Sequence, residues 1–372
     1  MEIHQFHTII QSGDAISDEM IHIARILRRW GFRSNIFAEF WDEECRPYGV
    51  PYQEYERFSS PGNVAIIHYS SWTPLISYAL ELPERKILIY HNVTPGAFCE
   101  PYERNKDDWP WWASRPPSEW LEYCRHMLGA IIARVDLAFG DSSFNRDELL
   151  ELGAERAGVL PILIDWERFG PPLWRESTAP DSRQSPTILF VGRIVPNKCQ
   201  HELVRMMECY TQVLGRDGRL VLVGDDESLP AYTRYVRDLS TVMPAGRVIL
   251  TGKVSQEELR ACYRTASAFV CMSEHEGFCV PLLEAMQYDI PVVAYASSAV
   301  PETMDGAGVL LHTKDPLKVA RVVDALIRDN SFRRDVLTMQ RKRIRRAREE
   351  NPEALLLGAL TALFALEEES SG

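Results

Sequence analysis

Short apolar runs alternate with longer amphipathic stretches along the first half of the chain. The runs predict strands at Glu2–Ile9, Arg33–Phe37, Val64–Tyr69, Lys86–His91, Leu137–Gly140 and Gly158–Pro161. Between them, Ala15–Trp30 and Ser118–Val135 have the apolar spacing of amphipathic helices. Strands that alternate with helices predict a parallel sheet covered by helices on both faces.

The same alternation restarts after Gly170–Pro186, a stretch rich in proline and polar residues that we interpret as a linker. The second half predicts strands at Thr187–Val191, Arg219–Val223, Val248–Leu250, Ala268–Cys271, Pro291–Ala294 and Val309–Leu311. Two helices, about Ser331–Arg348 and Pro352–Glu368, end the chain. We expect the last helix to cross back onto the N-terminal domain.

The pattern therefore predicts an α/β protein of two Rossmann-like, doubly wound domains that face each other across a cleft. We expect an N-terminal domain at residues 1–170, joined by the helix of residues 352–372, a linker at 171–186 and a C-terminal domain at 187–350. Open α/β sheets bind ligands outside the carboxyl ends of their strands. The two sheets would thus offer one ligand site between them.

Composition narrows the class of protein. A chain of 372 residues suits two domains, and its net charge of −12 argues against a dedicated nucleic-acid binder. The eight cysteines have no zinc-knuckle spacing and favour reduced, partly buried thiols in a cytosolic protein. The N-terminus lacks a signal-peptide pattern, and the longest apolar stretch, Ala354–Leu366, is too short to cross a bilayer.

The densest chemical signal lies in Ser273–Thr303. An apolar strand ends near Cys271, a loop carries Glu276, and a helix begins near Val280 or Pro281 with Glu284 in its first turn. A helix start offers unpaired N–H groups to an anion, and carboxylates accept hydrogen bonds from neighbouring hydroxyls. The alternative is structural: Glu284 interacts with its own helix dipole and Glu276 is solvated.

A second signal follows the strand Thr187–Val191. Gly192 turns the chain, and Arg193 and Lys198 come before the next helix. Two cations at the edge of a sheet suit a diphosphate and the charge that grows on it as a leaving group. The alternative is an ordinary surface loop with two solvated cations.

Together these residues resemble the signature of retaining glycosyltransferases of family 4, which have the GT-B fold. The family pattern is an acid, Gly-Phe-Gly, an apolar residue, Pro and a second Glu, and the chain departs from it with Cys279 at the second glycine. The resemblance implies that Glu276 contacts donor-sugar hydroxyls, that Glu284 holds the ribose and that Arg193 and Lys198 bind the diphosphate. It also places the backbone of the segment Gly277, Phe278, Cys279 and Val280 beside the sugar and diphosphate. The added Cβ of Cys279 should narrow this loop.

The resemblance extends to weaker positions. It implies nucleotide contacts for Gly192, Gly224, Lys253 and Val254, with the last two at the base, and a backbone approach to the donor phosphates at Gly13. Asp14 would bind an acceptor hydroxyl, or simply cap the first helix. His91 would contact the donor sugar, with a structural histidine as the alternative, and His68 is a weaker candidate of the same kind.

Two features fall outside the signature. Asp107–Trp112 is an aromatic-rich loop that would stack on a sugar, touch a lipid interface or pack in a core. Arg341–Arg348 is strongly basic and would be a solvated helix face or a weak contact with an anionic membrane surface.

The resulting expectation is a retaining, metal-independent hexosyltransferase that needs no cofactor. It would use a UDP- or GDP-hexose and a glycan or lipid-linked acceptor in cell-surface polysaccharide synthesis, in the cytoplasm or at the inner face of the membrane. No Asp-x-Asp motif for a metal beside the phosphates is present. The alternatives are a GT-B nucleotide-sugar epimerase and an inactive nucleotide-sugar-binding protein.

Overall fold

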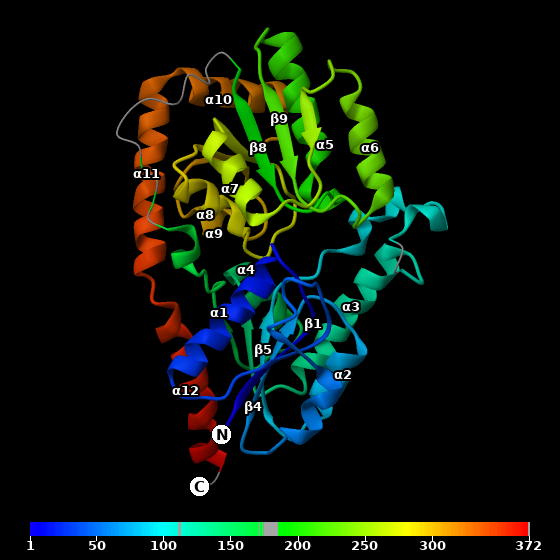
Figure 1. Cartoon of the computed structure of the whole chain (residues 1–372), viewed down its shortest axis with the longest axis vertical. Helices are drawn as coiled ribbons and strands as arrows, with labels where there is room; N and C mark the ends of the chain where they lie inside the picture. Colours follow the sequence, from blue (N-terminus) through cyan, green and yellow to red (C-terminus); the bar gives the residue numbers. More distant parts are fainter. Residues whose placement is uncertain (111–112, 171, 173, 175–184, 371–372) are drawn as a thin grey trace. The chain divides into compact units, whose positions relative to one another are not determined.

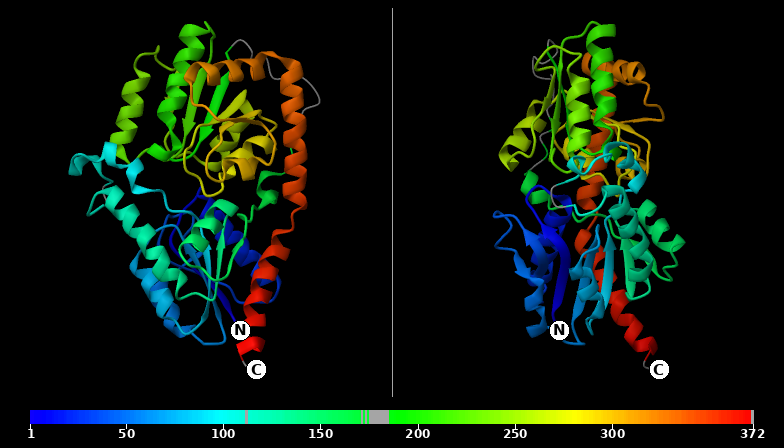
Figure 2. Two further views of the ribbon diagram at one scale, coloured as in Figure 1. Left: turned by 180° about the vertical axis from the view of Figure 1, so that it is seen from behind. Right: turned by 90° about the vertical axis from the view of Figure 1, so that its right-hand side faces the viewer.

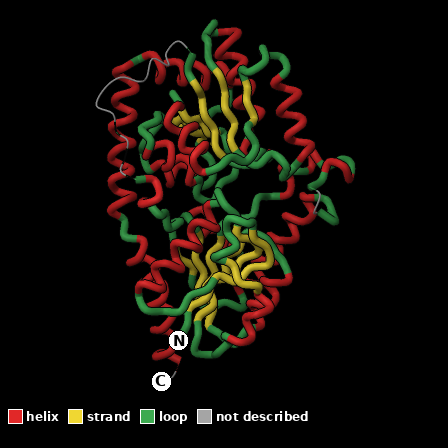
Figure 3. Tube along the Cα trace, in the orientation of Figure 1, coloured by secondary structure: helices red, strands yellow, loops and turns green. Residues whose placement is uncertain are grey.

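The computed structural model describes residues 1–110, 113–170, 172, 174 and 185–370 (Figure 1). Backbone contacts divide the chain into two compact units. Unit 1 contains Met1–Val93, Leu121–Arg168 and Glu350–Gly372, and unit 2 contains Thr94–Trp120 and Phe169–Glu349. Strands and helices alternate in both units, as Figure 3 shows.

Unit 1 is built on a parallel sheet with the order β3-β2-β1-β4-β5-β6-β7 among the described residues. Its strands are β1 (Ile3–Ile10), β2 (Ile36–Trp41), β3 (Gly49–Pro51), β4 (Val64–Tyr69), β5 (Arg85–Tyr90), β6 (Leu137–Gly140) and β7 (Ala157–Val159). Its helices are α1 (Ala15–Arg29), α2 (Pro74–Glu81), α3 (Pro117–Ile132), which begins in unit 2, α4 (Ser143–Glu151) and α12 (Pro352–Ser370).

The core of unit 1 explains why the last helix belongs there. Leu356, Leu360 and Leu363 of α12 pack with Ile23 and Leu27 of α1 against the strands of the sheet. All five side chains are buried, so α12 covers a surface that the strands alone would leave exposed to water. The predicted return of the C-terminal helix to the N-terminal half is confirmed.

Unit 2 is built on a second parallel sheet with the order β10-β9-β8-β11-β12-β13 in the described chain. Its strands are β8 (Thr187–Val191), β9 (Arg219–Val223), β10 (Val248–Leu250), β11 (Ala268–Cys271), β12 (Val292–Tyr295) and β13 (Val309–Leu311). Its helices, seen beside this sheet in Figure 2, are α5 (Gln200–Glu208), α6 (Pro230–Ser240), α7 (Gln256–Thr265), α8 (Val280–Gln287), α9 (Val300–Met304), α10 (Pro316–Arg328) and α11 (Asn330–Glu349). The expected α/β class with two Rossmann-like sheets is confirmed.

Most strands lie within two residues of their predicted bounds, but one strand is missing from the prediction and another is shifted further. Strand β3 is missing from the prediction because three residues, one of them Pro51, carry no periodic signal. Strand β2 begins at Ile36 and runs to Trp41, later than the predicted Arg33–Phe37. Arg33 and Asn35 already accept backbone hydrogen bonds from β1, at 3.0 Å each, ahead of the regular strand.

The segment Thr94–Trp120 groups with unit 2, whereas the sequence placed it with the rest of residues 1–170. The ring of Tyr102 lies 4.9 Å from that of Tyr232, and Asp108 pairs with Arg234 on α6. Within the aromatic-rich loop, Trp109 donates from Nε1 to the carbonyl of Glu103 (3.1 Å). Trp111, Trp112 and most of the predicted linker lie outside the described residues.

The basic stretch Arg341–Arg348 on α11 is largely engaged by its own unit. Arg341 binds both carboxylate oxygens of Asp289 (2.8 and 2.7 Å), and Arg346 pairs with Asp305 (2.6 Å). Arg343 donates to the carbonyl of Thr303 (3.0 Å), and Arg348 donates to that of Gly170 (2.8 Å). Most of the arginines of this stretch are thus bound to acceptors of unit 2 itself. Among the described helices, none is long and apolar enough to cross a membrane.

The packing of α12 is testable by truncating one side chain on its buried face. Leu360→Ala should lower the free energy of unfolding by about 2–4 kcal/mol, because it removes buried methyl groups and leaves a cavity. Urea unfolding monitored by circular dichroism measures the change. Leu357→Ala is the control, since Leu357 on the same helix is 52% exposed. Equal losses in the two variants would contradict the burial of this face.

Candidate functional site

The candidate site of unit 2 lies where the strand order of its sheet reverses. Strands β8 and β11 are hydrogen-bonded neighbours, and the chain leaves them toward opposite edges of the sheet. The carboxyl ends of two such strands leave a crevice in which α/β proteins bind ligands. The loops carrying Lys198 and Glu276 begin at these two strand ends, as the sequence predicts.

Hydrogen bonds from the backbone and the side chain of Asn197 join the two loops. The N–H of Glu274 donates to the carbonyl of Asn197 (2.8 Å), and the Asn197 side chain donates from Nδ2 to the carbonyl of His275 (3.0 Å). Asn197 is buried. Its position between two predicted site residues makes it a positioning residue that the sequence pattern did not reveal.

The structure brings Lys198 and Glu276 together. Lys198 Nζ lies 2.5 Å from Glu276 Oε2, and the two side chains are 19% and 8% exposed. The backbone N–H of Glu276 donates to Ser298 Oγ (2.8 Å), so a third loop, after β12, also holds this residue. Arg193 is exposed on the loop after β8, and its carbonyl accepts from Gln200 Nε2 (2.7 Å). Lys198 and Glu276 thus provide a cation for an anion and a carboxylate for hydroxyl groups, and Arg193 lies on the same loop as Lys198.

Glu284 lies deeper in its helix than the sequence suggested. Because α8 begins at Val280, Glu284 is its fifth residue and not part of the first turn. Its Oε2 accepts a 2.6 Å hydrogen bond from the hydroxyl of Tyr263 on α7, and its side chain is buried. Burial and the neighbouring carboxylate raise the pKa of Tyr263 well above its usual value, so Tyr263 stays a donor. No sequence signal pointed to this tyrosine.

The segment Gly277–Val280 connects the loop to α8 through an unusual backbone. Cys279, the N-cap of α8, has φ 75° and ψ 60°, in the left-handed region that favours glycine. A side chain in this region costs roughly 1 kcal/mol. The preceding carbonyl, that of Phe278, accepts from the hydroxyl of Thr303. The cysteine therefore occupies a position whose backbone suits the glycine of the family pattern.

Close backbone approach explains two of the predicted glycines. Gly192 donates to the carbonyl of Val223 (2.8 Å), and Gly224 donates to that of Gly252 (3.1 Å). A Cβ on Gly224 would lie 2.3 Å from the carbonyl oxygen of Gly192, so no side chain fits there. Lys253 is exposed and Val254 half-buried on the adjoining loop after β10. The strand-end loops of β8, β9 and β10 thus form one continuous edge.

In unit 1 the loop after β1 has a structural role. Gly13 has φ 74°, and Asp14 caps α1 by accepting from the N–H and the hydroxyl of Ser17, both at 2.9 Å. The structure therefore supplies the capping role that the sequence left open. Binding of an acceptor hydroxyl by Asp14 stays a prediction.

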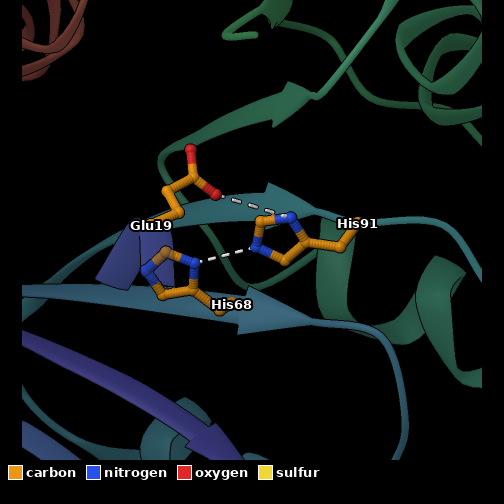
Figure 4. A group of neighbouring side chains, drawn as sticks. All are labelled: Glu19, His68 and His91. Atoms are coloured by element: carbon orange, nitrogen blue, oxygen red, sulfur yellow. Dashed lines mark hydrogen bonds and ion pairs between the residues drawn. The ribbon is translucent and has the colours of Figure 1, made fainter. Parts of the chain in front are cut away.

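Unit 1 also contains a chain of buried polar side chains that leads to His91 (Figure 4). His68 Nδ1 lies 2.8 Å from His91 Nε2, and His68 Nε2 lies 3.0 Å from Gln5 Oε1. His91 Nδ1 lies 3.0 Å from Asp141 Oδ2 and 3.8 Å from Glu19 Oε2. The side chains of His91, Asp141 and Glu19 are at most 2% exposed.

The hydrogen-bond partners fix the protons of this chain. Gln5 donates from Nε2 to the carbonyl of Met20 (2.9 Å), so its Oε1 must accept from His68. Burial holds the pKa of His68 well below its usual value, and the neutral ring accepts at Nδ1. His91 therefore donates to His68 from Nε2. Its other nitrogen, Nδ1, shares a hydrogen bond with Asp141, whose pKa is raised by burial.

Neighbouring carboxyl groups change the pKa of His91. Burial lowers the pKa of His91, but the nearby carboxyl groups of Asp141 and Glu19 outweigh it and raise the value overall. Burial raises the pKa of Glu19 to about 8 and lowers that of His7, on β1, to about 4. In this arrangement His91 is a hydrogen-bond donor, and its predicted contact with a donor sugar stays a prediction.

Glu19, His68 and His91 each place one ligand atom within 4.8 Å of the others, which raises the question of a metal site. Two nitrogens on one tetrahedral zinc ion lie about 3.3 Å apart at ordinary bond lengths. The 2.8 Å between the two rings is the length of a hydrogen bond and leaves room for a proton only. The cluster fits a proton network better than a metal site.

Comparison with known proteins gives the site a family context. Residues 174–349 match the family model described as "Glycosyl transferases group 1". Over 217 residues the chain is 30% identical to D-inositol 3-phosphate glycosyltransferase of Xylanimonas cellulosilytica, covering 55% of this chain and 51% of that protein. It is 29% identical to a GDP-mannose-dependent alpha-(1-6)-phosphatidylinositol monomannoside mannosyltransferase of Mycobacterium tuberculosis, covering 55% of each. The chain thus spans about half the length of these curated relatives.

Solved structures resemble almost the whole chain. HepE of Anabaena, in complex with UDP and glucose, aligns with a TM-score of 0.69 at 14% identity and covers 97% of this chain and 100% of that one. Sucrose-phosphate synthase of Thermosynechococcus elongatus aligns with a TM-score of 0.71 at 18% identity, covering 98% and 100%. At these identities the likeness establishes the GT-B fold alone.

The buried carboxyl of Glu19 predicts a pH-dependent stability. Its pKa in the folded protein, about 8, exceeds its ordinary value of 4.5, so its stabilising contribution is complete below pH 4.5 and is lost as pH rises through 8. Glu19→Gln keeps a neutral side chain that accepts from the N–H of Leu163, as Glu19 Oε1 does at 2.9 Å. The melting temperature of this variant should fall less than that of the wild type between pH 5 and pH 8.

Differential scanning fluorimetry across this pH range provides the measurement. Glu43→Gln serves as the control, because the Glu43 side chain is 85% exposed. Parallel curves for Glu19→Gln and the wild type would show that Glu19 is already ionised at low pH.

Proposed function

We propose that this protein is a retaining glycosyltransferase, because residues 174–349 match the family model described as "Glycosyl transferases group 1". It moves a hexosyl unit from a UDP- or GDP-hexose to an acceptor hydroxyl. The observation that carries the proposal is the pairing of Lys198 with Glu276 at the strand-order reversal of unit 2. This arrangement sets a hydroxyl-binding carboxylate beside a phosphate-binding cation.

The proposed chemistry follows from the charges. The bond between the sugar C1 and the diphosphate oxygen breaks, and negative charge grows on the departing diphosphate. Lys198, Arg193 and the first N–H groups of α8 stabilise that charge. The acceptor oxygen attacks C1 from the same face, and its proton passes to the donor phosphate. No divalent ion takes part, because these groups supply the positive charge.

Glu276 and Glu284 have separate tasks in this proposal. Glu276 accepts hydrogen bonds from the donor sugar, and Lys198 exchanges its present partner, Glu276, for a phosphate oxygen. Glu284 accepts from the ribose hydroxyls while Tyr263 holds one of its oxygens. Gly192, Gly224, Lys253 and Val254 line the nucleotide. Gly13, Asp14 and His91 of unit 1 serve the phosphates, the acceptor and the sugar.

The names of the similar proteins support both GDP and UDP as the nucleotide of the donor. One curated relative is named for GDP-mannose, and one structural neighbour holds UDP and glucose. Neither of these is named as an epimerase. An inactive donor-binding protein is the competing function, and Cys279 at the glycine position is the observation that favours it.

We place the reaction in the cytoplasm or at the inner face of the membrane, with a glycan or lipid-linked acceptor in surface polysaccharide synthesis. The eight free cysteines favour a reducing compartment. The names of the two curated relatives point to inositol-containing acceptors as the first to try.

The proposal is tested by incubating the protein with UDP- and GDP-hexoses and inositol-containing acceptors, with and without a chelator. We expect a glycosylated acceptor with retained anomeric configuration, measured by mass spectrometry and NMR, and equal rates in both conditions. Tight donor binding without product would favour the inactive protein, and an isomerised free sugar would favour an epimerase.

Loss of the Glu284 carboxylate should weaken binding of the nucleotide-sugar donor. Glu284→Ala removes charge-assisted hydrogen bonds to the ribose. The binding free energy of the nucleoside diphosphate should therefore become less favourable by about 1–3 kcal/mol. Isothermal titration calorimetry measures this change. Tyr263→Phe is the control, because it removes only the hydroxyl that donates to Glu284 and leaves the carboxylate free to bind the ribose. An unchanged affinity in Glu284→Ala would remove the residue from the site.

Lys198→Ala should lower kcat more than it weakens donor binding. The charge that Lys198 faces grows as the diphosphate departs, so its interaction is strongest in the transition state. Steady-state kinetics alongside calorimetric donor titration separate the two effects, with Lys342→Ala as the control because Lys342 is an exposed lysine on α11. A loss confined to donor affinity would contradict this role.

A further inference from the structure

The donor loop of unit 2 contains two thiols that face each other. Cys271 ends β11, Cys279 caps α8, and their sulfur atoms lie 4.0 Å apart. The residues are 1% and 8% exposed. The Glu276 carboxylate completes a group in which one ligand atom from each residue lies within 4.8 Å of the others. The cysteine that departs from the family pattern is thus one of three potential metal ligands.

The distances suit a thiolate-bound cation. Two thiolates on a tetrahedral zinc ion, with Zn–S bonds of about 2.3 Å, lie about 3.8 Å apart. The observed 4.0 Å is within a few tenths of an ångström of this value. Unlike the histidine pair of unit 1, these sulfur atoms are far enough apart for one ion to bind both.

The charge of the surroundings also suits such an ion. Two thiolates and the Glu276 carboxylate carry three negative charges, and a divalent cation with Lys198 supplies three positive charges. The net charge of the cluster is then zero, as it is with neutral thiols and the present Lys198–Glu276 pair.

We propose that Cys271, Cys279 and Glu276 form a site for a thiophilic divalent cation such as Zn²⁺, with a fourth position open to water. Binding releases the two thiol protons, so affinity rises with pH. Lys198 supports the site by its bond to the liganding carboxylate.

One consequence rests on the proposed function. The metal engages Glu276 and fixes the backbone around Cys279, the groups assigned to the donor sugar. Metal and nucleotide sugar therefore compete, and the ion inhibits a reaction that itself needs none. Cys279 makes this form of control specific to chains that carry a cysteine at the glycine position.

A disulfide is the other chemistry open to two neighbouring thiols. The S–S bond is about 2.05 Å long, roughly half the present separation, so bond formation requires the loop to move and an oxidant to accept two electrons. Metal binding needs neither a loop movement of this size nor an oxidant.

Cobalt(II) is the probe, because its thiolate complexes give intense near-ultraviolet absorption. The reduced full-length protein is freed of metal and titrated with Co²⁺ and then with Zn²⁺ as competitor. We expect one equivalent to bind with a thiolate band, at least tenfold more weakly in Cys271→Ala and in Cys279→Gly. Cys262→Ser, which changes a half-buried thiol on α7, is the matched control and should bind as the wild type does.

Cys279→Gly should fold as the wild type does, because glycine adopts φ 75° without strain. Weaker metal binding by this variant would therefore reflect the lost thiol. Absence of the band in the wild type, or its persistence in both variants, would overturn the proposal. Loss of both titratable thiols without metal would also overturn it, in favour of a disulfide.

Competition is measured by titrating UDP- and GDP-hexose into wild type and Cys279→Gly with and without Zn²⁺. We expect Zn²⁺ to raise the apparent dissociation constant only when Cys279 is present. If neither sugar nucleotide binds in any condition, the proposed function fails, whereas the cobalt spectrum still decides the metal site.

Discussion

The ion pair between Lys198 and Glu276 is the contact on which the site depends. It joins side chains 78 positions apart in the sequence, and it forms because β8 and β11 lie side by side where the strand order reverses. Asn197 and Ser298 hold the two loops from either side, so neither charged residue depends on its own loop alone. A charge pair held in this way suits a diphosphate sugar, since each partner has a complementary group to exchange for the other.

Cys279 shows how one residue changes the chemistry of a loop without changing the fold. The backbone there keeps the left-handed conformation that suits glycine. The added thiol therefore projects from a fixed position and meets Cys271 at the end of the adjacent strand. A substitution that looks unfavourable locally thus creates a soft ligand pair beside a carboxylate.

Unit 1 contributes a different kind of preorganisation. A carbonyl of α1 fixes the amide of Gln5, the amide fixes the tautomer of His68, and His68 accepts a hydrogen bond from His91, which also bonds to Asp141. Glu19 remains neutral over much of the pH range because burial outweighs the attraction of His91. The orientation of the His91 ring therefore depends on a series of buried hydrogen bonds that begins at α1.

The sequence pattern predicted the α/β class and most strand positions, because hydrophobic period and length are local properties of the chain. It led us to expect the return of the last helix, which the packing of α12 in unit 1 then established. It also indicated Lys198, Glu276 and Glu284 through their spacing around predicted strand and helix ends. Three contacts appear in the folded structure without any signal in the sequence: Thr94–Trp120 packs with unit 2, Tyr263 binds Glu284, and Cys271 faces Cys279. These contacts join separate elements of the chain, and which of them meet depends on strand order and packing, which no local pattern encodes.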